Sequence, residues 1–168
     1  MPKIVLETTK GKITLELDAE KAPISTQNVL DYVNAQHYDG TVFHRVIDGF
    51  MIQGGGYDEE LKKRPTRAPI KNEANNGLKN VRGSVAMART PDPDSATSQF
   101  FINVVDNAFL DFKDETPEGW GYCVFGHVIE GMDVVDAIKA VETGAHGPFS
   151  KDCPQEPVRI ESASVLEE

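Results

Sequence analysis

The residues of this chain best suited to chemistry lie between Phe43 and Gly56, where a single arginine, Arg45, stands among large apolar side chains ahead of a glycine cluster. An arginine facing an apolar surface costs free energy unless a ligand or a carboxylate satisfies its guanidinium group. The apolar surroundings of Arg45 therefore favour a substrate pocket. The alternative is a solvent-exposed arginine on an edge strand, which fits the spacing about equally well.

A β-hairpin is the element expected to position this arginine. Two strand-like runs, 42–47 and 50–53, meet at Asp48-Gly49, a dipeptide that favours a tight turn. If the first run is a regular strand, Arg45 shares a sheet face with Phe43 and Ile47. The glycines that follow, 54–56, match neither GxGxxG nor a glycine-rich loop ending in Lys-Ser or Lys-Thr, and they indicate a bend in a strand rather than a phosphate site.

Other common chemistries find little support in the sequence. There is no GxSxG motif, and the four histidines form neither an HExxH motif nor an i, i+4 pair, which argues against a serine hydrolase and a metal hydrolase. His44, inside a strand-like run, is interpreted as a hydrogen-bonded core residue rather than a general base. Cys123 and Cys153 have no zinc-ligand spacing and are expected to be free thiols. No metal site is predicted.

Hydrophobic alternation with a period of two dominates the chain and predicts a fold made mostly of strands. Two segments differ, 22–36 and 132–141, and their spacing near 3.6 residues, with Pro23 at the start of the first, predicts helices. So many strands with two helices favour an antiparallel sheet closed into a β-barrel and capped by the helices. The predicted strands are 4–8, 13–17, 42–47, 50–53, 83–88, 100–105, 122–129 and 158–165.

Composition sets the class of protein. The 168 residues suit one domain, 1–168, and the segments 57–80 and 90–98 are its long loops. The net charge of −10, without a basic block, argues against nucleic-acid and anionic-membrane partners. No signal peptide and no apolar run of membrane-spanning length is apparent, so we expect a cytoplasmic protein, and nothing indicates an obligate oligomer, so we expect a monomer.

Four ordered blocks of the sequence resemble the cyclophilins, a family of peptidyl-prolyl cis-trans isomerases, of the short bacterial cytoplasmic kind. The segment 43–55 resembles the family's FHRxIxGFMxQGG signature, and three later blocks follow in the family's order. These are Gly83-Ser84-Val85-Ala86-Met87-Ala88, Ser98-Gln99-Phe100-Phe101-Ile102 and Val124-Phe125-Gly126. The resemblance implies a closed eight-stranded antiparallel β-barrel capped by two α-helices, and rotation about Xaa-Pro bonds, which assists protein folding.

The same resemblance implies roles for individual residues. Arg45 corresponds to the catalytic residue. Gln53 and the backbone at Arg89 would hold the substrate by hydrogen bonds, and the apolar pocket would receive the proline ring. The residues implied in substrate binding are Phe50, Met51, Gln53, Ala88, Arg89, Gln99, Phe101, Phe109, Leu110 and Tyr122. No cofactor is implied, and the implied partners are proline-containing peptides and unfolded or flexible protein clients.

Three of these positions depart from the better-known eukaryotic members. Phe109 replaces a tryptophan, Tyr122 replaces a histidine, and Arg89 replaces the usual asparagine, while the loops around 92–96 and 115–121 are longer. Trp120 lies in the second loop and is not the family tryptophan. Because phenylalanine lacks the indole N–H donor, cyclosporin-type inhibitors are expected to bind with reduced affinity.

Two other functions fit parts of the sequence. The groove could bind proline-rich segments without catalysis, as a peptide-binding module or holdase does, although the presence of Arg45 favours an enzyme. A barrel that binds small molecules, as in lipocalins, would need a hollow interior, whereas this many Phe, Ile and Val residues predict a filled one.

Overall fold

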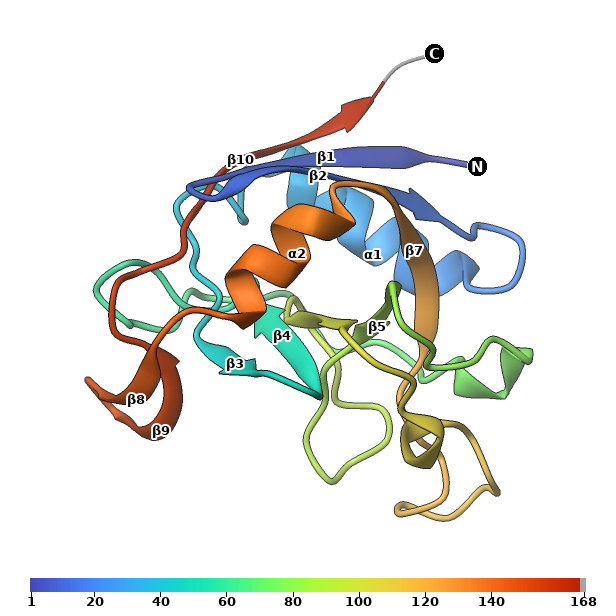
Figure 1. Ribbon diagram of the computed structural model, residues 1–168. Coiled ribbons are helices and arrows are strands. Elements are labelled where there is room, and N and C mark those ends of the chain that lie inside the picture. The colour runs from blue at the N-terminus through green and yellow to red at the C-terminus, as the bar shows by residue number, and fades with distance from the viewer. Residues whose placement is uncertain (167–168) are drawn as a thin grey trace.

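The computed structural model describes residues 1–166 and shows a mostly β fold with two α-helices (Figure 1). In chain order its elements are β1 (Lys3–Thr8), β2 (Gly11–Leu17), α1 (Pro23–Asn34), β3 (Arg45–Ile47), β4 (Met51–Gly54), β5 (Ser84–Met87), β6 (Phe100–Asn103), β7 (Val124–Glu130), α2 (Met132–Lys139), β8 (Thr143–His146), β9 (Phe149–Pro154) and β10 (Ile160–Leu166). Two single-turn 3-10 helices, η1 (Ala74–Asn76) and η2 (Ala108–Leu110), lie in the connections.

Eight of the strands form one curled antiparallel sheet in the order β10-β1-β2-β7-β5-β6-β4-β3. Each of these strands corresponds to a run predicted from the sequence. The expected closed barrel is wrong, however, because the sheet is a half-barrel whose edge strands, β3 and β10, do not pair with each other.

The gap between the two edge strands has a local cause. The chain before β3 meets the chain before β10 through a single isolated bridge, Val42 with Arg159, and a few backbone hydrogen bonds such as Phe43 N to Val158 O at 3.0 Å. Regular pairing does not continue, because β3 begins only at Arg45 and is three residues long. Pro157, which has no amide hydrogen, also precedes β10.

The main hydrophobic core fills the concave side of the curled sheet. It contains Leu6, Ile13, Leu17, Ile52 and Ile102, all fully buried, and the two helices pack against it. α1 contacts β10, while α2 lies between β2 on one side and β3 and β4 on the other (Figure 1). No helix within residues 1–166 has the length and apolar character needed to cross a membrane.

The start of α1 is fixed by the long loop rather than by its own sequence. The residue before the helix makes no side-chain cap, and Pro23 occupies the first turn, as predicted. The carboxylate of Glu73 instead accepts hydrogen bonds from the backbone N–H groups of Ile24 and Ser25, at 3.2 and 2.8 Å. An anion at this end is favoured by the helix dipole.

One β-hairpin was not predicted. β8 and β9 form a two-stranded hairpin next to β3, in the segment between α2 and β10. β8 reads Thr-Gly-Ala-His and contains no large aliphatic residue, so hydrophobic alternation gave no signal there. The hairpin packs through Phe149, whose ring lies 5.3 Å from that of His44 and 5.0 Å from that of Tyr57.

Candidate active site

The candidate site lies on the convex face of the sheet, opposite the main core. Successive strand residues point to opposite faces, so Ile52 and Ile102 enter the main core while Met51 and Phe101 point the other way. A second, smaller apolar cluster forms there. Its buried members are Met51, Ala86, Phe101, Leu110 and Val124.

A pocket of about 280 Å³ opens above this cluster. Ten residues line it, and all ten belong to the set that the sequence analysis assigned to catalysis and substrate binding. They are Arg45, Phe50, Met51, Gln53, Ala88, Arg89, Phe101, Phe109, Leu110 and Tyr122. Gln99 is the one residue of that set that does not line the pocket.

Arg45 lies at the rim, on the edge strand β3, with its side chain exposed to solvent. Both alternatives from the sequence therefore describe it, since it is an exposed edge-strand residue and also lines the pocket. Its expected partnership with Phe43 is wrong, because Phe43 is fully buried in the main core and precedes the regular part of the strand. Ile47 packs against the smaller cluster, as the alternation predicted.

Two glutamines connect Arg45 to the interior of the site. Arg45 Nη1 donates to Gln53 Oε1 at 3.4 Å, and Gln53 Nε2 donates to Gln99 Oε1 at 2.9 Å. Gln99 thus stands behind Gln53 and fixes its amide group. Gly56 provides the space for Gln99, because a Cβ at position 56 would come within 2.5 Å of the Gln99 side chain.

Aromatic rings form two walls of the pocket. Phe50 and Phe109 stack at a centroid distance of 5.7 Å, and Phe101 meets Tyr122 edge to face, also at 5.7 Å. The 3-10 helix η2 carries both Phe109, which is 61% exposed, and Leu110, which is buried in the pocket floor. The Arg45 guanidinium also lies 6.0 Å from the centre of the Phe50 ring.

Arg89 uses its side chain to hold the loop 90–98 and the loop 115–121 together. Its guanidinium donates to the carbonyl oxygens of Gly121, Pro117 and Thr90 at 2.8, 3.0 and 3.0 Å, and lies 5.0 Å from the centre of the Tyr122 ring. Arg89 also lines the pocket, and the backbone contact with substrate implied by the resemblance stays a prediction.

Residues that the sequence analysis did not single out hold Phe50 in place. Asn107 Nδ2 donates to the Phe50 carbonyl at 2.9 Å and to Asn103 Oδ1 at 2.7 Å, and both asparagines are buried. The sequence does contain one signal that could have revealed this contact. Asn103 is a polar residue in the predicted strand 100–105, and a buried amide needs hydrogen-bond partners.

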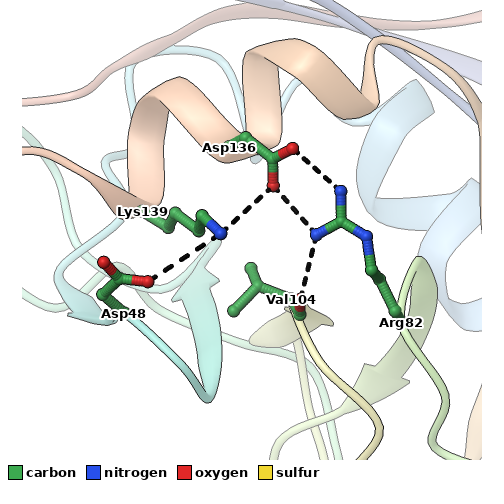
Figure 2. A network of polar contacts seen from close by, with 5 residues as sticks. All are labelled: Asp48, Arg82, Val104, Asp136 and Lys139. Carbon is green, nitrogen blue, oxygen red and sulfur yellow. Dashed lines mark hydrogen bonds and ion pairs between the residues drawn. The ribbon is translucent and has the colours of Figure 1, made fainter.

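An ion-pair network ties the other side of the hairpin to α2 (Figure 2). Arg82 forms a bidentate ion pair with Asp136, with hydrogen bonds of 2.8 and 2.9 Å, and also donates to the Val104 carbonyl at 3.0 Å. Lys139 joins Asp136 to Asp48 in the hairpin turn, at 3.6 and 3.9 Å. The turn that separates Arg45 from Phe50 is therefore linked to the helix.

His44 and the cysteines take no part in the pocket. His44 is a buried residue that packs against Tyr57, as expected, but within residues 1–166 its Nδ1 has no hydrogen-bond partner, so the expected hydrogen bonding is wrong for this atom. Burial, with a contribution from Arg45, lowers the pKa of His44 to about 4. Cys123 and Cys153 are free thiols, as predicted, and burial raises the pKa of Cys123 to about 11.

An apolar pocket with a permanently charged donor at its rim suits a reaction driven by binding and electrostatics. Within residues 1–166, no three His, Cys, Asp or Glu side chains come together in a way that could hold a metal ion. The fold and site together match a class of enzymes that act on the conformation of a peptide chain.

Comparison with known proteins identifies the family. The model of the family "Cyclophilin type peptidyl-prolyl cis-trans isomerase/CLD" matches residues 3–165. Peptidyl-prolyl cis-trans isomerase cyp18 of Streptomyces antibioticus is 57% identical over 99% of both chains, and peptidyl-prolyl cis-trans isomerase B of Escherichia coli is 56% identical over 98% of this chain and 99% of its own. The chain belongs to the cyclophilin-type peptidyl-prolyl cis-trans isomerases and is an isomerase of the rotamase kind.

A solved structure agrees with the fold at greater sequence distance. The cyclophilin-type isomerase of Cryptosporidium parvum, crystallised in the presence of the dipeptide Ala-Pro, superposes with a TM-score of 0.79 at 23% identity and covers 99% of both chains.

Proposed function

We propose that this enzyme accelerates rotation about Xaa-Pro bonds by using Arg45 to stabilise the twisted amide while the apolar pocket holds the proline ring. The observation that carries the proposal is the position of the Arg45 guanidinium at the rim of a pocket whose floor is Met51, Phe101 and Leu110. A proline ring is apolar and needs such a floor, and its nitrogen then lies near the rim.

The chemistry requires no nucleophile and no metal. Resonance gives the peptide C–N bond partial double-bond character and a rotation barrier of about 20 kcal/mol. In the twisted state the nitrogen lone pair becomes localised and can accept a hydrogen bond, which the planar ground state does not offer. A donor placed there stabilises only the transition state, and each 1.36 kcal/mol of such stabilisation raises the rate about tenfold.

Gln53 and Gln99 support this role for Arg45. The hydrogen bond that Gln53 Nε2 donates to Gln99 Oε1 fixes the Gln53 amide, whose oxygen accepts from Arg45. A guanidinium held from one side keeps its other N–H groups for the substrate, and preorganised donors lose little when charge shifts in the reaction. Arginine suits the task because its planar fork keeps a fixed angle and its charge is permanent.

The substrates proposed are proline-containing peptides and unfolded or flexible protein clients, with the backbone of Arg89 as a hydrogen-bonding site. The relative from Cryptosporidium parvum was crystallised with Ala-Pro, a dipeptide of this chemistry. We further propose that the enzyme acts as a single-domain monomer in the cytoplasm, a reducing compartment in which its two free cysteines would remain thiols. Assistance to protein folding would follow from the isomerase activity.

Exchange NMR on a short Xaa-Pro peptide tests the proposal directly. The native protein should speed cis-trans interconversion, and Arg45→Ala should lower kcat/KM by about a hundredfold or more while peptide affinity changes little. Arg45→Lys is the matched control, which keeps the charge and loses the fork, and should retain only part of the rate. The exposed position of Arg45 makes unfolding of either variant unexpected.

The rival is a peptide-binding module without catalysis, which the exposed Phe109 ring at the pocket mouth would also serve. Binding without acceleration by the native protein would contradict the proposed mechanism and support this alternative. Equal rates for Arg45→Ala and the native protein would leave an isomerase whose catalysis does not depend on Arg45.

A further inference from the structure

A second hollow adjoins the pocket described above. It has a volume of about 310 Å³ and is lined by Arg89, Thr90, Pro91, Pro117, Glu118 and Tyr122. Arg89 and Tyr122 line both cavities, so the two share a wall. Its other lining residues come from the loops 90–98 and 115–121, and they have no part in the expected catalytic role or in binding the proline ring.

Arg89 forms this wall and is not available to bind an anion. Its Nε donates to the Gly121 carbonyl, Nη1 to the carbonyls of Thr90 and Pro91, and Nη2 to that of Pro117. The guanidinium thus donates to four carbonyl oxygens, and the Tyr122 ring lies on one side of it. These hydrogen bonds from Arg89 hold the two loops at a fixed separation.

Arg89 and Glu118 are the charged residues that line the hollow, and the two chain segments that form it carry mostly negative charge. The segments 89–98 and 111–121 contain six carboxylates, whereas Arg89 and Lys113 are the two cations. Glu118 lines the hollow itself, is exposed, and within residues 1–166 makes no ion pair and no side-chain hydrogen bond. A cation is therefore the complementary ligand for the carboxylate at this position.

The remaining lining suits the stem of a long basic side chain. Pro91, Pro117 and the Tyr122 ring are apolar and would cover methylene groups, while Glu118 would meet the charged head. Because an extended chain advances about 3.3 Å per residue, a hollow that shares a wall with the prolyl pocket is within reach of a side chain one or two residues from the proline.

We propose that this hollow is a second subsite, which selects clients with a lysine or arginine within two residues of the isomerised proline, and that Glu118 determines the selection. The proposal rests on the proposed function, because it assumes that the proline ring occupies the first pocket. Its two supports are the wall shared with that pocket and the exposed Glu118 carboxylate, which lies beside an Arg89 guanidinium already bonded to carbonyl oxygens.

The test uses peptides with a single proline and Lys, Gln or Glu at each of the two positions before and after it, compared by exchange NMR. At low ionic strength, Lys should give about two- to fivefold higher kcat/KM than Glu at one of these positions, the range of an exposed ion pair. Glu118→Gln should remove most of this ratio, Glu118→Lys should invert it, and about 0.5 M NaCl should suppress it.

Glu20→Gln is the matched control, since Glu20 is an exposed glutamate outside both cavities and its loss leaves the net charge equal to that of Glu118→Gln. An unchanged Lys-to-Glu ratio in Glu118→Lys would overturn the inference, as would an equal effect of Glu20→Gln and Glu118→Gln. Isomerisation of all peptides at equal rates would overturn the inference alone, whereas the absence of any isomerisation would overturn the proposed function and the inference with it.

Discussion

Arg45 and Gln53 face each other across the β3–β4 ladder, and Arg45 Nη1 lies 3.4 Å from Gln53 Oε1. This distance is at the long end of the range for a hydrogen bond, so the guanidinium is oriented rather than tightly held. A loosely held donor can tighten on a substrate, as groups in unliganded active sites commonly do.

Gln99 should matter for the rate although it does not line the pocket. Gln99→Leu removes the acceptor of the 2.9 Å bond from Gln53 and frees that amide to rotate. The loss of one such bond should lower kcat/KM by about two- to tenfold, and kcat more than peptide affinity. Exchange NMR with a peptide titration separates the two. An effect on affinity alone would show that Gln99 shapes the pocket and does not orient Arg45.

Phe109 should limit the affinity for cyclosporin-type inhibitors. Its ring is 61% exposed and stacks on Phe50, but it has no N–H donor. Phe109→Trp should therefore tighten inhibitor binding by up to about tenfold, the value of one added hydrogen bond, while isomerase activity changes little. Isothermal titration calorimetry measures this directly. Phe109→Tyr serves as the control for added size and polarity without an indole donor.

His44 should make stability depend on pH. Its pKa is lowered to about 4 by burial, against about 6.5 in the unfolded chain, so the unfolded state binds more protons between these values. The contribution of the neutral His44 to the free energy of unfolding is fully present above pH 6.5. It is lost as the pH drops toward 4, by about 3 kcal/mol over the whole window. Urea unfolding at a series of pH values tests this.

The comparison variant for that experiment is His44→Phe, which fits the aromatic surroundings of Tyr57 and Phe149 and should flatten the dependence. A part of the slope should remain, since burial also lowers the pKa of His37. An undiminished slope in His44→Phe would assign the effect to other groups.

The network around Asp136 should contribute a small, salt-sensitive stabilisation (Figure 2). Its charged side chains are all partly or largely exposed, and such ion pairs contribute little and are screened by salt. Arg82→Ala should lower the free energy of unfolding more than Lys139→Ala, because Arg82 also donates to the Val104 carbonyl. Chemical denaturation at low salt and at about 0.5 M salt should show that the loss of stability in each variant is smaller at high salt. Equal losses at both salt concentrations would contradict this account.

The sheet strands were predictable because their runs carry large apolar residues, in alternation as in β1 and β2 or in succession as in β6. The hairpin β8–β9 was not, because Thr143, Gly144, Ala145 and His146 show no such alternation and its turn depends on Gly147 in a left-handed conformation, with φ of 55°. The closed barrel was predicted wrongly because the number of strands does not determine whether the edge strands β3 and β10 pair with each other.

At the site, the sequence signature placed the pocket-lining residues but not how they are held. Arg89 illustrates the difference: its position was predicted, whereas its bonds to the carbonyls of Gly121 and Pro117 depend on where two distant loops come to rest. The complete burial of Phe43, on the opposite face from Arg45, likewise depends on where β3 begins, and alternation alone cannot locate that start.

The division of the sheet into a concave face for the main core and a convex face for the pocket has an evolutionary consequence. Side chains such as Phe109 and Tyr122 can be exchanged without disturbing Ile52 or Ile102, because a layer of backbone separates the two groups. Ligand preference can thus drift among relatives, or be redesigned in the laboratory, while the folding of the scaffold stays the same.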